Sequence, residues 1–163
     1  MKYTLTCAIV LTCLVSLVLA QPAGLKEAAV KMSGKAITLR YSELPAAGGQ
    51  IAGKPAFLHT DSDLEVQGLA VPKGDYALFV VPDAKEWQLI INKQTGAQAA
   101  TPNPKTELGR VPMDMKKAAA PADVLRMTLA SYGNVAGKLE LTYGTTVASV
   151  PFNLDTLRPS VEW

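Results

Sequence analysis

Hydrophobic and polar residues alternate with a period of two along most of the chain after residue 34. Near the start of this region, Ile37, Leu39 and Tyr41 alternate with Thr38 and Arg40. This pattern is typical of a strand with one face on the core and the other in water. The alternation recurs in four further segments, each predicted to be a strand: residues 64–67, 111–115, 125–129 and 138–143.

Two apolar runs, at residues 76–81 and 87–92, lack this alternation. Only the short turn 82–85 separates them, so they are predicted to form a hairpin in the middle of a sheet. Residues 45–53 and 96–109 are rich in Gly, Ala or Pro and are predicted to be loops. The second loop is long for a compact domain, which indicates a functional or mobile segment.

Helix signals are weak. Residues 25–32 suit either a turn or two of helix or a first strand, and Pro121 limits any helix at residues 116–123 to a single turn. We therefore predict an all-β fold, a single-domain antiparallel sandwich or barrel-like fold of about 8–10 short strands. The domain would cover residues 21–163 and end in an extended surface tail at residues 155–163.

Residues 1–20 have the pattern of a cleavable secretory signal peptide. Lys2 supplies a positive start, residues 5–20 carry no charge, and the small or modest side chains of residues 18–20 mark a cleavage site before Gln21. The uncharged run is shorter than the roughly 20 residues that a permanent membrane anchor needs. We therefore predict a periplasmic or secreted protein with no membrane attachment after cleavage.

The mature chain would contain no cysteine, because Cys7 and Cys13 both lie in the signal. Cys13 also lacks the small preceding residues that a lipoprotein site would need. Thiol chemistry, disulfides and cysteine-ligated metals are thereby excluded from the predicted domain. The 16 basic and 14 acidic residues become 15 and 14 without Lys2, a net charge of about +1. This balance gives little driving force for binding nucleic acid or a membrane surface.

His59 is the only histidine. One histidine without cysteine cannot assemble the usual zinc site, so no metal is predicted. His59 could act as a general base with a serine or a carboxylate, although the G-x-S-x-G nucleophile motif is absent. It could instead contact a ligand, or be an ordinary strand or loop residue. A glycine-rich phosphate loop is also absent, and no cofactor is predicted.

Acidic residues at alternate positions follow His59. Asp61, Asp63 and Glu65 match the first oxygen positions of an EF-hand calcium loop. The match then ends, because Val66 and Pro72 stand where that loop needs Gly and Glu. A polar turn leading into a strand explains the pattern as well. Asp61 and Asp63 therefore join His59 only as candidate residues for binding a ligand.

The central hairpin carries a family resemblance. The chain resembles the bacterial domain-of-unknown-function family 2911, which shows a Pro-x-Gly-x-Tyr-x-Leu-Phe strand and a Glu-Trp strand ending in Asn-Lys. The resemblance covers roughly residues 34–152 and implies an exported bacterial domain of unknown function. The matching residues of the hairpin are Pro72, Gly74, Tyr76, Leu78, Phe79, Glu86, Trp87, Asn92 and Lys93, with weaker matches by spacing at Tyr41, Ser42, Gly48, Ile51, Gly53, residues 110–113 and residues 139–141.

The chain departs from that family just before a further strand that is expected to start near Ala56. The family typically carries a Trp-Arg-Thr-Gly-Ala-Asn-Glu segment, whereas only Lys54 and Pro55 stand between Gly53 and Ala56 here. The family's arginine after the loop glycine is replaced by Gly49. The resemblance implies that any family activity located in this segment is lost.

These observations favour a non-enzymatic exported domain that binds a small ligand or a protein partner, with the loop at residues 96–109 available for recognition. A carbohydrate-binding module is an alternative, which predicts a row of exposed rings such as Trp87, Tyr132 and Trp163. A hydrolase is a further alternative, which predicts His59 in a cleft with a carboxylate or serine within hydrogen-bond reach.

Overall fold

The computed structural model describes residues 24–46, 51, 53–96 and 99–156. This part of the chain folds into β-strands, loops and turns and contains no α-helix. None of the described residues belongs to a helix long and apolar enough to cross a membrane. The nine strands of the described chain are β1 (Leu25–Met32), β2 (Lys35–Ser42), β3 (Ala56–Thr60), β4 (Leu64–Val66), β5 (Leu69–Val71), β6 (Gly74–Val81), β7 (Trp87–Asn92), β8 (Glu107–Tyr132) and β9 (Ala136–Leu154).

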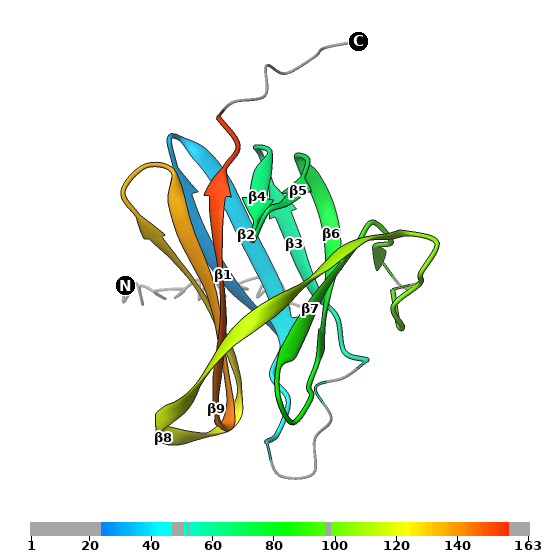
Figure 1. The fold of residues 1–163 in the computed structure, drawn as a ribbon, viewed down its shortest axis with the longest axis vertical. Helices are drawn as coiled ribbons and strands as arrows, with labels where there is room; N and C mark the ends of the chain where they lie inside the picture. Colours follow the sequence, from blue (N-terminus) through cyan, green and yellow to red (C-terminus); the bar gives the residue numbers. More distant parts are fainter. Residues whose placement is uncertain (1–23, 47–50, 52, 97–98, 157–163) are drawn as a thin grey trace, which may run out of the picture.

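All nine strands join one antiparallel sheet in the order β1-β2-β3-β6-β7-β8-β9-β4-β5. Strand β8 connects the two halves of this sheet, because residues 107–113 pair with β7 and residues from 114 onward pair with β9. Figure 1 shows β8 crossing the molecule diagonally, so that the sheet folds back on itself. The sheet keeps two edges, β1 and β5, and is not closed into a barrel. The predicted all-β fold is confirmed, in its sandwich form.

The hydrophobic core lies between the two halves of the bent sheet. Ile37 and Leu39 of β2 and Leu58 of β3 are buried in the same cluster as Leu141 and Val150 of β9. Residues of opposite parity on β2 and β3 point to the outer face of the sheet, as the period-two alternation predicts. Apolar side chains hold the two layers together, and the outer face of β2 and β3 carries mostly polar residues.

The central hairpin of β6 and β7 is confirmed, and the structure explains why it is apolar on both faces. Ala77, Phe79 and Ile90 point away from the core and form a second buried cluster with Ala99. Ala99 belongs to the loop between β7 and β8, and its side chain therefore covers part of the outer face of the hairpin. The loop predicted at residues 96–109 thus forms part of the fold, and it ends where β8 begins at Glu107.

The last two strands are longer than predicted. Strands β8 and β9 have 26 and 19 residues, whereas the sequence indicated only short strands. Residues 116–123, where a single helical turn was allowed, are part of β8 instead. The pairing register of β8 with β9 shifts between Lys117 and Ala122 and again before Arg126. Pro121 lies in this irregular stretch, where a bulge accommodates a residue that cannot donate a backbone hydrogen bond.

The ends of the chain are described only in part. Residues 25–32 form strand β1 and no helical turn. The predicted signal at residues 1–20 and most of the predicted tail, including Trp163, lie outside the described residues. Asp155, at the start of the tail, donates its backbone N–H to the carbonyl of Asp63 at 2.9 Å.

Candidate functional site

Polar side chains of three neighbouring strands meet on the outer face of the sheet. Thr38 of β2 lies opposite His59 of β3, and His59 lies opposite Asp75 of β6. In the next row, Arg40 of β2 lies opposite Phe57 of β3. Because residues two apart in a strand share a face, the register brings all five side chains to one surface.

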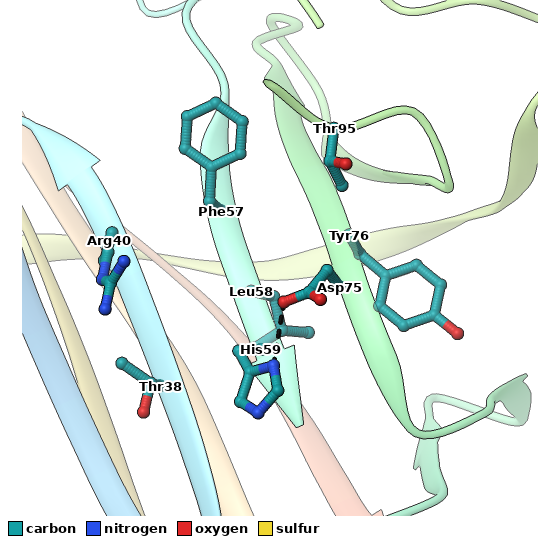
Figure 2. A pocket seen from close by; sticks show the side chains of 8 residues that line it. All are labelled: Thr38, Arg40, Phe57, Leu58, His59, Asp75, Tyr76 and Thr95. Atoms are coloured by element: carbon teal, nitrogen blue, oxygen red, sulfur yellow. Dashed lines mark hydrogen bonds and ion pairs between the residues drawn. The ribbon is translucent and has the colours of Figure 1, made fainter. Parts of the chain in front are cut away.

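This surface is hollowed. The hollow has a volume of about 450 Å³, and the loop after β7 contributes Thr95 to its wall. Figure 2 shows Thr38 and Arg40 on one side, Phe57 and His59 along the middle strand, and Asp75 facing His59. Leu58 and Tyr76 also border the hollow, but both are buried in the core cluster. The side chains available to a ligand are therefore those of Thr38, Arg40, Phe57, His59, Asp75 and Thr95.

His59 is held between two carboxylates. Its Nδ1 lies 2.8 Å from Oδ1 of Asp75, and its Nε2 lies 3.1 Å from Oδ1 of Asp61. A neutral imidazole has a single N–H and can donate to one carboxylate only, whereas the protonated ring donates to both. The hydrogen bond to Asp75, and then that to Asp61, raise the pKa of His59 above its usual 6.5. The geometry thus favours the imidazolium form.

Asp61 connects this cluster to the neighbouring strand. Its Oδ2 accepts the backbone N–H of Ala36 at 3.2 Å. That hydrogen bond, followed by the one from His59, lowers the pKa of Asp61 below its usual 3.8. Asp61 therefore stays ionised over the pH range in which His59 titrates, and it positions the imidazole at the rim of the hollow.

Asp63 does not belong to this site. Its Oδ1 accepts the backbone N–H of Lys73 at 2.7 Å, which ties the start of β4 to the turn before β6. Glu65, the third residue of the calcium-like pattern, lies on β4 and pairs with Ala70 and Asn153. Of the three candidate residues, the structure brings His59 and Asp61 together and gives Asp63 a role in the fold.

A metal centre does not form from these acidic residues. Among the residues that the structure describes, no group of three His, Cys, Asp or Glu side chains could hold an ion. The reason at His59 is geometric, because Asp61 and Asp75 bind opposite nitrogens of the ring. The imidazole thereby lies between the two carboxylates.

Arg40 and Phe57 complete the hollow. Nε of Arg40 donates to Oε2 of Glu27 on β1 at 3.0 Å, and the arginine side chain is 62% exposed. The ring of Phe57 packs against the cluster formed by Ala77 and its neighbours and is only half buried. The hollow therefore presents one apolar ring that the fold holds in place, beside charged groups that already have partners.

Asn92 anchors the loop that forms the far wall. This side chain is fully buried, and its Nδ2 donates to the carbonyl of Asn103 at 2.9 Å. Its Oδ1 accepts the backbone N–H of Gln94 at 2.9 Å and the hydroxyl of Thr106 at 2.7 Å. One amide thus joins both ends of the loop of residues 93–106 to the end of β7. Thr95 of the hollow stands on this anchored loop.

Sequence reasoning found only part of this site. His59 and Asp61 stood out by residue type, but Thr38 and Arg40 were visible only as the polar face of a predicted strand. Asp75 is a variable position of the family pattern, and Phe57 carried no signal. Lys54 and Pro55 lead directly into β3, which carries Phe57 of the hollow.

The fold and the site define a class of protein, a single-domain β-sandwich with an open polar hollow on its outer face. Within that class, the model of a protein family of unknown function (DUF2911) matches residues 25–152. The chain belongs to this family, as its central hairpin indicated. A comparison with curated proteins found no match, and a comparison with solved structures found none either.

Proposed function

We propose that this chain is an exported, non-enzymatic domain whose outer-face hollow binds a small ligand. The observation that carries the proposal is the hollow itself, with its fixed aromatic ring and polar groups from β2, β3, β6 and the loop after β7. Its volume of about 450 Å³ falls within the roughly 300–1,000 Å³ of small-molecule sites. A few placed polar groups around an apolar surface are also typical of such sites.

The state of His59 supports binding over base catalysis. A general base needs a free lone pair within reach of the proton that it removes. Here both ring nitrogens face carboxylates at 2.8 and 3.1 Å, and the raised pKa favours the protonated ring. A hydrolase would have to break one of these contacts before His59 could accept a proton.

The exposed rings do not support an extended carbohydrate platform. Trp87 is buried in the core at 8% exposure, and Tyr132, at 56% exposure, lies at the end of β8. A row of rings along one face is therefore not formed by these two residues. The half-buried Phe57 is the ring that the hollow offers.

The binding proposal is tested with a small-fragment screen on the ¹⁵N-labelled protein purified after expression of the full chain. We expect saturable shifts of the amides of Thr38, His59, Asp75 and Thr95, and Arg40→Leu should weaken binding about tenfold. Arg126→Leu is the matched control, because Arg126 is an exposed arginine of β8 that pairs with Thr142. Fragments that leave the hollow amides unchanged would overturn the proposal.

Export is tested separately, by determining where the protein is found and which residue forms its N-terminus. Expression of the full chain in a bacterial host should yield periplasmic or secreted protein whose sequence begins at Gln21. Replacing Leu11 and Leu14 of the uncharged run by Lys should retain the protein, uncleaved, inside the cell. Uncleaved protein in the cytoplasm of cells that express the unchanged chain would contradict export.

A further inference from the structure

The charged groups around the hollow are already paired within the protein. Arg40 contacts Glu27 at 3.0 Å, and His59 contacts Asp75 at 2.8 Å and Asp61 at 3.1 Å. A ligand with a full charge would gain less from Arg40 or Asp75, because the opposite charge of Glu27 or of His59 already offsets the charge of each. An uncharged ligand can bind to the pairs as they stand.

The same pairs keep hydrogen-bonding capacity that faces outward. A guanidinium has five N–H donors, and the contact with Glu27 uses the one on Nε. A carboxylate has about four acceptor positions, and the contact of Asp75 with His59 engages Oδ1. The hydroxyls of Thr38 and Thr95 both donate and accept. The hollow therefore offers donors at one side, acceptors at another and hydroxyls that serve as either.

A ligand hydroxyl matches this mixture because it also donates and accepts. A molecule with several hydroxyls can accept from Arg40 and donate to Asp75 at the same time without carrying charge. Phe57 adds a flat apolar surface beside these groups, and its packing against Ala77, Phe79 and Ile90 fixes the ring before a ligand arrives. The C–H face of a pyranose ring fits such a surface, and a preformed ring costs little ordering entropy on binding.

We propose that the ligand of the hollow is an uncharged, polyhydroxylated molecule of the mono- or disaccharide class, stacked on Phe57 between Arg40 and Asp75. This inference rests on the proposed function, since it names the ligand class of the same site. It differs from a platform for long polysaccharides, because the volume of the hollow suits one small molecule and, of its two rings, Tyr76 is buried and Phe57 is accessible.

The test compares three sets of probes on the ¹⁵N-labelled protein: D-glucose, N-acetyl-D-glucosamine and maltose; glycine and the dipeptide Ala-Ala; and acetate and methylammonium. We expect one or more of the sugars to shift the amides of Thr38, Phe57, His59 and Thr95 saturably, with Kd in the millimolar range or tighter. Phe57→Ala should weaken that binding about tenfold, and Phe57→Tyr should restore it.

Two controls guard against general effects of substitution. Tyr132→Ala removes an exposed ring at the end of β8, and Arg126→Leu removes an exposed arginine of the same strand. Both should leave sugar binding unchanged, whereas Arg40→Leu should weaken it about tenfold. Because the Arg40 side chain is 62% exposed, this variant tests the site even if Phe57→Ala folds poorly.

The alternative outcomes separate this inference from the proposed function. If the amino-acid or charged probes shift the hollow amides and no sugar does, the ligand class is wrong and the binding function stands. If sugar binding is lost in Tyr132→Ala and kept in Phe57→Ala, the inference is overturned because the sugar site lies elsewhere. If neither these probes nor the fragment screen shifts the hollow amides, both proposals are overturned.

Discussion

At the scale of single residues, His59 is the group whose state depends most directly on pH. Its two contacts need a proton on each ring nitrogen, so deprotonation removes one donor and leaves a lone pair facing a carboxylate. The negative charge of that carboxylate then repels the lone pair of the deprotonated ring nitrogen. His59 therefore joins β3 to Asp75 of β6 and to the turn at Asp61 most firmly in its protonated form.

The pH dependence follows from the raised pKa of His59. A group whose pKa is higher in the folded state stabilises the fold fully below its unfolded value of 6.5, and this contribution is lost as pH rises through the folded pKa. NMR titration of the imidazole should give a pKa above 6.5, and the unfolding midpoint should fall slightly across that transition. The effect should shrink in high salt, because the side chain is 49% exposed.

Two variants test whether the carboxylate of Asp75 causes the raised pKa of His59. Asp75→Asn removes the charge that accepts from Nδ1, so the pKa of His59 should move toward 6.5. Asp63→Asn is the matched control, because Asp63 bonds to Lys73 and should leave the titration of His59 unchanged. A pKa at or below 6.5 in the unchanged protein would contradict the doubly hydrogen-bonded geometry.

At the scale of elements, the loop after β7 covers part of the sheet, and one side chain anchors both of its ends. Asn92 makes three hydrogen bonds to it from a fully buried position, and Ala99 supplies its apolar contact. Buried polar groups that lose a partner cost about 1–3 kcal/mol each. The folded position of the loop should therefore depend strongly on the side chain of Asn92.

Asn92→Ala should lower the free energy of unfolding by about 1–3 kcal/mol and increase amide exchange at residues 93–106. Exchange in β2 and β9 should change much less if the loop detaches locally. Asn153→Ala is the control, since Asn153 is an exposed residue of β9 and should cost at most about 0.5 kcal/mol. Equal costs for the two variants would refute the anchoring role.

The same elements show how far the sequence predicts the structure. Period-two alternation located β2, and two continuous apolar runs located the central hairpin, because burial of one face or of both faces leaves a local pattern. The length of β8 could not be predicted, since Pro121 and its neighbours resemble a break and only pairing with β9 shows a bulge. The site could be predicted at His59 and Asp61, but Arg40, Phe57 and Asp75 come together through pairing between strands distant in sequence.

At the scale of the whole molecule, the bent sheet places the residues that stabilise the fold and the residues of the hollow on opposite faces. Leu58 of one half and Leu141 of the other half are both buried in the core between them. Arg40, His59 and Asp75 lie instead on the outer face of one half. Substitutions in the hollow should therefore change binding with little change in stability. Because β8 belongs to both halves and the core is shared, neither half can keep its buried face covered when the other unfolds.

The protein should consequently unfold in a single cooperative transition. With Trp163 replaced by Phe, fluorescence reports on Trp87 at the start of β7 in one half, while far-UV circular dichroism reports on the whole sheet. Leu141→Ala, in the other half and fully buried, should lower the free energy of unfolding by about 2–5 kcal/mol. Both signals should still change at the same urea concentration, as two-state unfolding requires. A Trp87 transition that keeps its original midpoint while the dichroism shifts would show that the halves unfold independently.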